Sequence, residues 1–148
     1  MTLVWTVVLF VHVSAAIFWV GGQLMLVFVV MPLLRRAASP EVIGTIARLS
    51  GRRFARISNF GLFPALIVTG PLLAWHDGVR FRNFSSTFDH VLAIKVFVVV
   101  VVLGLAGAHG VAAKRLTRRG VRSLALLTTG LSVLIVALAA ALAMLPSP

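Results

Sequence analysis

Residues 3–34, LVWTVVLFVHVSAAIFWVGGQLMLVFVVMPLL, contain no Asp, Glu, Lys or Arg. A helix crosses the hydrocarbon core of a bilayer with about 20 apolar residues, so this stretch is long enough to span a membrane and to tilt or project beyond it. No basic region precedes it, and it is longer than the ~7–15-residue apolar region of a signal peptide. We therefore expect it to remain in place as a first membrane helix.

Three further apolar runs follow, at about residues 57–75, 90–113 and 124–145. The chain is 60% hydrophobic and 11% charged, which leaves too few polar side chains to cover a soluble domain. The four runs predict an all-α fold: a four-transmembrane-helix antiparallel bundle that forms a single integral membrane domain over residues 1–148. Pro64 and Pro71 lie inside the second run and predict a kink there.

A basic segment, Ser39–Ser58, separates the first two runs. Ser39 and Pro40 are typical of the N-cap and the first position of a helix. Apolar residues then recur at helical spacing among arginines. This pattern predicts either an amphipathic cytoplasmic helix on the membrane surface or a basic N-terminal extension of the second span. The sequence leaves both alternatives open.

Basic residues are distributed unevenly among the loops. The chain has 14 Lys+Arg against 3 Asp+Glu, a formal net charge of +11. By the positive-inside rule, the first and third loops face the cytoplasm, and both termini lie outside. Trp5 and Trp75 then belong to an outer aromatic belt. The second loop holds only Arg80 and Arg82, whereas the first and third hold Arg35, Arg36, Arg48, Arg52, Arg53, Arg56, Lys114, Arg115, Arg118, Arg119 and Arg122.

The basic loops indicate anionic lipid headgroups as partners, above all for Arg48, Arg52 and Arg53. A nucleic-acid partner is disfavoured because the chain has no basic soluble module. The absence of Cys excludes disulfides, thiolate metal sites and a cysteine nucleophile. The sequence shows no Ser/His/Asp set and no phosphate-binding loop, so no catalytic residue is assigned.

Three ionisable side chains lie inside the expected spans: His12 in the first, and Lys95 and His109 in the third. Such groups are costly in lipid and are therefore functional candidates. At ~1.5 Å per residue, His12 and Lys95 lie about 14 and 9 Å below the outer ends of their spans, and His109 lies about 30 Å below. We therefore expect His12 and Lys95 to share a cofactor site in the outer leaflet, with His109 farther away.

Other side chains flank this expected site. Trp19 follows His12 by seven residues, or two helical turns, and so shares its face. It either walls a flat cofactor or packs between helices. Simpler roles are also open, since a histidine can hydrogen-bond a carbonyl and Lys95 can extend its ammonium to the interface. The candidate metal ligands near the outer boundary are His12, His76, His90 and Met144.

Small residues predict close approach between helices. Gly21 and Gly22 form a flat patch in the first span. In the third span a spacing of four residues defines a seam of Gly104, Ala108 and Ala112.

Three stretches of the chain, covering roughly residues 11–116, resemble the CopD (copper resistance D) superfamily. The first is HVSAAIFWVGG, from His12 to Gly22, which continues to Pro32 and Arg35–Arg36. The second is RRFARIS, from Arg52 to Ser58, followed by Thr69–Gly70. The third is Lys95 in an apolar span shortly after a polar outer loop. Each motif is short, and their order and spacing together carry the resemblance.

The resemblance implies a four-helix unit of copper-transport proteins in the bacterial inner membrane. It also implies kinship with the HemJ-type protoporphyrinogen oxidases, in which a first-span His and a third-span Lys are associated with haem b binding and activity. In this sequence the matching residues are His12 and Lys95, and His109 is an approximate match to a further histidine. The chain lacks the acidic and tyrosine-rich features of HemJ-type chains; it has no Tyr.

We therefore expect a protein that handles or transports copper across the inner membrane, with a copper-donor or respiratory protein as partner and an oligomer as one possible state. A haem b-binding redox protein is the alternative, and an accessory bundle without a cofactor is the third. A non-enzymatic role is favoured; as an enzyme, the chain would be a haem-dependent membrane oxidoreductase.

Overall fold

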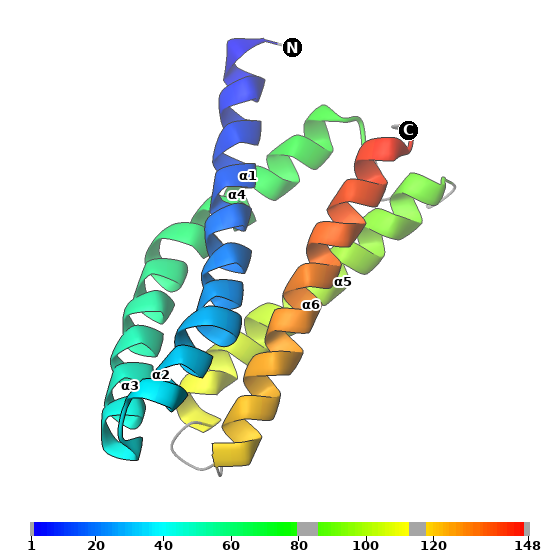
Figure 1. Ribbon diagram of the computed structural model, residues 1–148. Helices are drawn as coiled ribbons and strands as arrows, with labels where there is room; N and C mark the ends of the chain where they lie inside the picture. The colour runs from blue at the N-terminus through cyan, green and yellow to red at the C-terminus, as the bar shows by residue number, and fades with distance from the viewer. Residues whose placement is uncertain (1, 80–85, 113–117, 147–148) are drawn as a thin grey trace. The chain divides into compact units, whose positions relative to one another are not determined.

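The computed structural model describes residues 2–79, 86–112 and 118–146, the side chains of residues 108–112, 118 and 119 excepted. Arg80, Arg82, Lys114 and Arg115 lie outside these ranges, and so does the side chain of His109. The described residues form helices and no strand, which confirms the all-α prediction. In chain order (Figure 1) the elements are α1 (Leu3–Leu24), η1 (Met25–Val30), α2 (Met31–Ala37), α3 (Pro40–Ile57), η2 (Ser58–Leu62), α4 (Phe63–His76), α5 (Thr87–Ala112) and α6 (Arg118–Met144).

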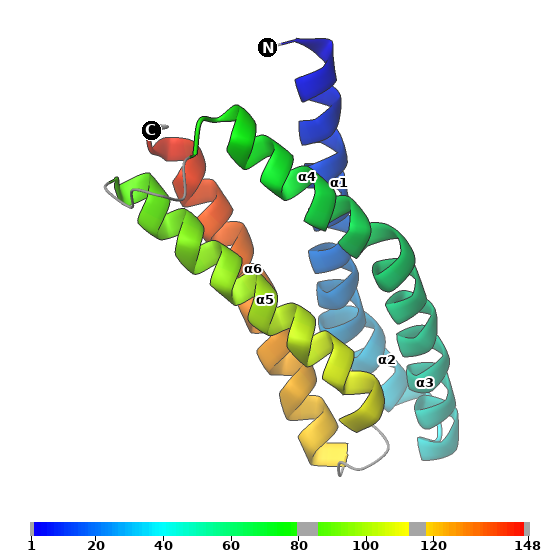
Figure 2. The same cartoon turned by 180° about the vertical axis from the view of Figure 1, so that it is seen from behind.

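The chain divides into two compact units, residues 1–76 and 77–148. In the first unit, α1 packs against α4, and in the second, α5 packs against α6. The two helices of each pair run in opposite directions, as Figures 1 and 2 show. Each unit is thus an antiparallel helical hairpin, and a single domain over residues 1–148 remains a prediction.

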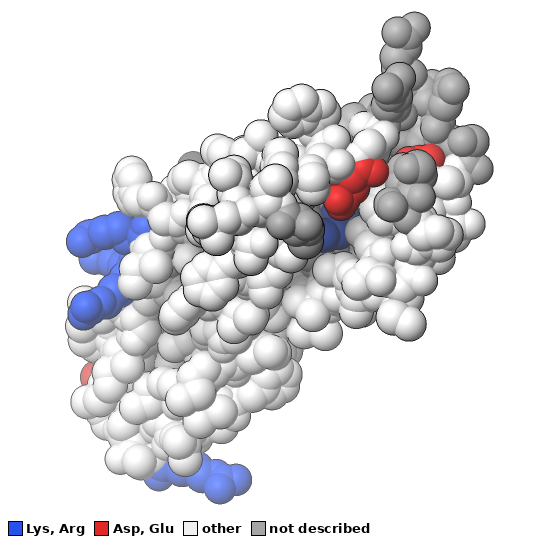
Figure 3. All heavy atoms as spheres, turned by 90° about the horizontal axis from the view of Figure 1, so that it is seen from above, with Lys and Arg blue, Asp and Glu red and all other residues white. Residues whose placement is uncertain are grey.

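Among the residues that the structure describes, four helical stretches are long and apolar enough to cross a membrane. They are Leu3–Ala37, Pro40–His76, Thr87–Gly107 and Gly120–Met144, of 35, 37, 21 and 25 residues. Most of the surface seen from above in Figure 3 carries neither basic nor acidic side chains. The chain is therefore an integral membrane protein.

The basic segment is continuous with the second span. Helix α3 begins at Pro40, with Ser39 at the N-cap position but without a capping hydrogen bond from its side chain. It then continues through η2 into α4 without a break. Of the two alternatives that the sequence leaves open, the structure favours the basic N-terminal extension.

Both long helices of the first unit contain a π-helical stretch just before a proline. The amide of Met31 donates to the carbonyl of Leu26, one residue before Pro32. The amide of Phe63 donates in the same way to the carbonyl of Ser58, one residue before Pro64. A proline ring clashes with the carbonyl four residues earlier, and the wider π turn relieves that clash. Figure 2 shows the α3–α4 helix curving over this region.

The first unit is held by a regular seam between α1 and α4. Along α1 the contacting residues are Trp5, His12 and Trp19, each seven residues after the last. Their partners on α4 are His76, Thr69 and Phe63, which run in the opposite direction along the chain. A spacing of seven residues returns to the same helix face every two turns. The predicted common face of His12 and Trp19 is thus the face that packs against α4.

In the second unit, α5 begins with a capping box. The Asp89 amide donates to Ser86 Oγ at 3.1 Å, and the Ser86 amide donates to Asp89 Oδ2 at 3.2 Å. On α6, the hydroxyls of Thr128 and Ser132 donate to the carbonyls of Leu124 and Thr128, each at 2.8 Å. The hydroxyls are therefore satisfied within their own helix, as lipid requires.

Within the second unit, Gly104 of the predicted small-residue seam does not contact the described residues of α6, and its predicted approach to the first span stays a prediction. This residue is exposed, and a Cβ placed on it would meet no atom within 4 Å. The side chains of Ala108 and Ala112 lie outside those described.

In the first span the two neighbouring glycines differ: a Cβ on Gly21 would meet nothing within 4 Å, whereas one on Gly22 would lie 2.5 Å from Phe54 Cε2. Gly22 is therefore the position at which α1 admits the Phe54 ring of α3.

This difference gives a matched pair of variants. Gly22→Ala should be less stable than Gly21→Ala by about 1 kcal/mol or more, because its methyl group forces the Phe54 ring to move, while both variants gain the same helix propensity from alanine. Gly21→Ala should leave stability unchanged or raise it slightly, since alanine favours helix and its methyl group meets open space. Thermal unfolding of the purified protein in detergent measures both. Equal melting temperatures for the two variants would contradict the close Gly22–Phe54 contact.

Candidate functional site: an intramembrane histidine held by a threonine

The candidate site is centred on His12 of α1 and Thr69 of α4. His12 Nδ1 lies 2.7 Å from Thr69 Oγ1, and Thr69 Oγ1 donates to the carbonyl of Ala65 at 2.5 Å. A hydroxyl group has one proton, and Thr69 gives it to Ala65. His12 must therefore supply the proton of the other hydrogen bond from Nδ1. In the neutral imidazole, this assigns the lone pair to Nε2.

Gly70 lets the imidazole lie close to α4. A Cβ on Gly70 would be 3.4 Å from His12 Cε1, which is van der Waals contact, so the ring lies directly beside this position. Thr69 is 8% exposed, and the hydrogen bond is therefore largely shielded from solvent. Thr69 fixes the rotation of the imidazole through Nδ1, and Gly70 leaves room for the ring.

Trp19 packs against α4, one contact along the seam from His12. Its side chain is 5% exposed. The ring centroids of Trp19 and Phe63 are 5.3 Å apart with an interplanar angle of 81°, an edge-to-face arrangement that stabilises aromatic pairs. The structure thus shows the packing role for Trp19.

His76 lies one contact along the seam in the other direction, at the end of α4. Its ring stacks on Trp5 with centroids 4.1 Å apart and planes at 13°. Trp75 meets Trp5 edge-on at 6.4 Å. Because Trp5 precedes His12 by seven residues, this aromatic cluster lies about 10 Å along the helix from the His12–Thr69 contact. His12 and His76 therefore occupy separate levels of the seam.

The remaining candidates belong to the second unit. Lys95 is half-buried on α5. His90 Nδ1 donates to the carbonyl of Ser86 at 2.8 Å and is exposed, so it contributes to the first turn of α5. Met144 is 87% exposed at the end of α6. The pairing of His12 with Lys95 joins two separately described units and stays a prediction.

Within the described residues, no three His, Cys, Asp or Glu side chains come together in a way that would hold a metal ion. The predicted metal set of His12, His76, His90 and Met144 includes a thioether and spans both units, so it stays a prediction.

Sequence reasoning missed the partner of His12. Thr69 and Gly70 belong to the second stretch that resembles the CopD superfamily, and the sequence alone gives neither of them a role. The pattern that could have identified them is a hydroxyl residue followed by glycine in an otherwise apolar run, at the same membrane depth as a histidine in a neighbouring span.

Ser58 is a second residue that the sequence did not single out as a site. It is 2% exposed, and its Oγ has no hydrogen-bond partner among the described residues. Thr69, Thr128 and Ser132 each donate to the carbonyl four residues earlier. Ser58 begins the π-helical stretch η2 and makes no such bond. A buried hydroxyl without a partner costs about 1–3 kcal/mol, so Ser58 lowers the stability of the helix at η2.

The fold and the site define an integral membrane protein with a hydrogen-bonded histidine inside a helical hairpin. No family model matches the chain, and no solved structure matches it. It is similar to an uncharacterized protein of Aquifex aeolicus (strain VF5), with 34% identity over 90 residues. The match covers 61% of this chain and 62% of the length of that relative.

The site predicts a distinct effect of Thr69→Val. This variant keeps the shape of the side chain but leaves His12 Nδ1 without its acceptor, so it should lower the free energy of unfolding by about 1–3 kcal/mol. Thr69→Ser should retain most of the stability. Thr128→Val is the matched control, because its hydroxyl bonds only its own helix, and we expect it to lose less than Thr69→Val. Denaturant unfolding in detergent measures all three, and an equal loss for Thr69→Val and Thr128→Val would refute a contribution from the His12 bond.

Proposed function

We propose that the chain is a copper-handling protein of the membrane and that His12 is the central ligand. The observation that carries the proposal is the hydrogen bond from His12 Nδ1 to Thr69, which makes Nε2 the nitrogen with the lone pair. Histidine ligands usually donate their other ring N–H to an oxygen that fixes the tautomer and the ring orientation. Imidazole nitrogen is a suitable ligand for copper.

The meeting of two sequence motifs supports this proposal. His12 belongs to the first stretch that resembles the CopD superfamily, and Thr69–Gly70 belong to the second. In the structure these stretches touch at the Thr69 hydroxyl, and the His12 imidazole lies next to Gly70, where an added Cβ would be 3.4 Å from its Cε1. A purely packing role for each motif would not require a polar contact between them.

A haem b protein is the second candidate, and the same hydrogen bond favours it. A haem iron takes one axial imidazole on a given face, oriented through its other nitrogen. His12 fits that role, with Lys95 or an arginine as a partner for the haem propionates. The protein would then serve in electron transfer or, as an enzyme, as a haem-dependent oxidoreductase.

The proposed location is a bacterial inner membrane, with the first and third loops in the cytoplasm. The Trp5–Trp75–His76 cluster then marks the outer interface, because tryptophans gather at membrane boundaries. His12 lies about 10 Å inward from that cluster, within the outer leaflet. A copper donor or a respiratory partner would approach from the outer side.

The test is the copper and haem content of the purified protein. Elemental analysis measures copper, and absorbance spectra with and without dithionite detect haem. We expect His12→Ala to lose the bound group, and Thr69→Val to bind it about 10–100-fold more weakly, the usual effect of losing a hydrogen-bonded partner of a ligand. Lys95→Ala should change affinity or redox behaviour without unfolding the protein, and His109→Ala should have a smaller effect than His12→Ala.

The matched control is Thr128→Val, which should retain the bound group as the parent does. Retention of copper or haem by His12→Ala at the parental level would place the ligand elsewhere. A parent that binds neither group would rule out both candidates and leave the accessory bundle as the best account.

A further inference from the structure

The first unit has a groove at the end opposite to the Trp5–His76 contact. The groove lies between the α1–η1 helix and α3 and has a volume of about 330 Å³. Met25 and Leu26 line one wall, and Ser50, Arg53 and Ile57 line the other. The contact of Gly22 with Phe54 closes it toward the seam. The groove is shallow and wide open on one side.

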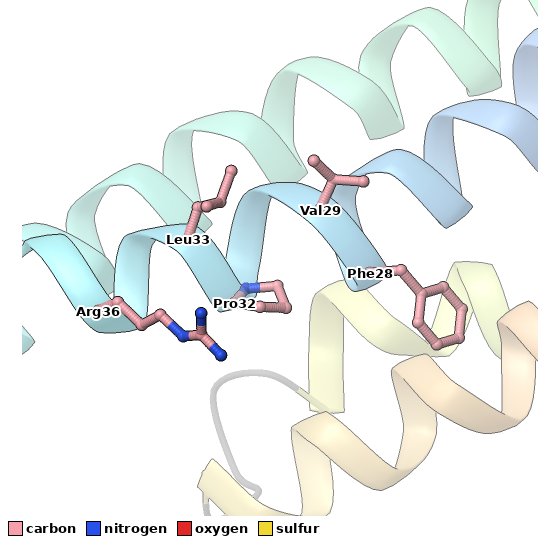
Figure 4. A pocket seen from close by; sticks show the side chains of 5 residues that line it. All are labelled: Phe28, Val29, Pro32, Leu33 and Arg36. Atoms are coloured by element: carbon pink, nitrogen blue, oxygen red, sulfur yellow. The ribbon is translucent and has the colours of Figure 1, made fainter.

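The groove has two walls from separate helices, which distinguishes it from the other groove of this unit. The latter has a volume of about 290 Å³ and is lined by η1 and α2 alone. Figure 4 shows its side chains projecting from one continuous helix. Its lining residues are Phe28, Val29, Pro32, Leu33 and Arg36.

The two-walled groove lies at the boundary of the hydrocarbon layer. Met25 follows Trp5 by 20 residues, about 30 Å along a helix, which is close to the thickness of a hydrocarbon core. Arg53 precedes His76 by 23 residues, or about 35 Å. If Trp5 and His76 mark one interface, Arg53 lies at the headgroups of the opposite one, and the apolar wall lies just inside the lipid.

The groove combines one positive charge with an apolar wall. Arg53 and Ser50 are three residues apart and so share a face of α3. A guanidinium forms paired, charge-assisted hydrogen bonds with phosphate oxygens, and the Ser50 hydroxyl adds a donor. Met25, Leu26 and Ile57 offer an apolar surface next to these groups. Residues 35–56 contain six arginines and a single acid, Glu41, which favours an anionic ligand.

We propose that this groove binds one anionic phospholipid, with its phosphate at Arg53 and Ser50 and an acyl chain along Met25, Leu26 and Ile57. This goes beyond a general attraction of the basic segment to the membrane. All three arginines are exposed, but Arg48 and Arg52 do not line the groove, and Arg48 donates to Thr45 Oγ1 at 3.3 Å. Arg53 is thus a specific lipid contact, and Arg52 contributes only its charge.

Lipid binding to the purified full-length protein tests the proposal. Native mass spectrometry during titration with phosphatidylglycerol gives the affinity, with phosphatidylcholine as the uncharged comparison. Arg53→Gln should weaken phosphatidylglycerol binding about tenfold or more. Arg52→Gln, with the same change in charge, should weaken it no more than about fivefold, the general contribution of one surface charge. Ile57→Trp should fill the groove and reduce binding without loss of helix content.

Three outcomes would overturn the proposal. The first is an equal effect of Arg53→Gln and Arg52→Gln, and the second is unchanged binding by a folded Ile57→Trp variant. The third is full competition by inorganic phosphate, which would assign the site to a free anion. The measurement requires neither copper nor haem, so its result is independent of the proposed function.

Discussion

A single hydroxyl proton determines the arrangement at the centre of the first unit. The hydroxyl of Thr69 has one proton, which it donates to the carbonyl of Ala65 in the same helix. Any second hydrogen bond to this oxygen must come from another donor, and His12 Nδ1 is in place to supply it. In lipid no water is present to offer an alternative. The tautomer of His12, the direction of its ring and the nitrogen that carries the lone pair therefore all follow from the position of Thr69.

The α1–α4 seam is what brings Thr69 to His12. Aromatic pairs lie on either side: the Trp5–His76 stack and the Trp19–Phe63 edge contact. In lipid the hydrophobic effect does not drive helices to associate, so side-chain packing and hydrogen bonds such as these must hold the hairpin together. Each of the two long helices also contains a π turn just before a proline, at Pro32 and at Pro64. The Ser58 hydroxyl, which has no partner among the described residues, lies in one of these turns.

The sequence predicts the helices and the faces well, because both follow from local patterns. The apolar runs identify four spans, and the interval of seven residues puts His12 and Trp19 on one face. The pairing of two helices is a different problem, since it depends on register. On α4, seven residues separate His76 from Thr69, but six separate Thr69 from Phe63. A single sequence does not reveal such an offset, and so Thr69 could not be matched to His12. The continuity of α3 with α4 was likewise open, because a basic amphipathic segment suits either a surface helix or an extension.

The protonation of His12 tests the account most directly. Solid-state NMR of the protein labelled with ¹⁵N-histidine in lipid bilayers, compared with His12→Gln, assigns the two ring nitrogens of this residue. At neutral pH we expect Nδ1 of His12 to be protonated and Nε2 to be unprotonated, and we expect Thr69→Val to weaken the preference for this tautomer. A dominant Nε2–H tautomer in the parent, unchanged in Thr69→Val, would contradict the hydrogen bond on which the site rests.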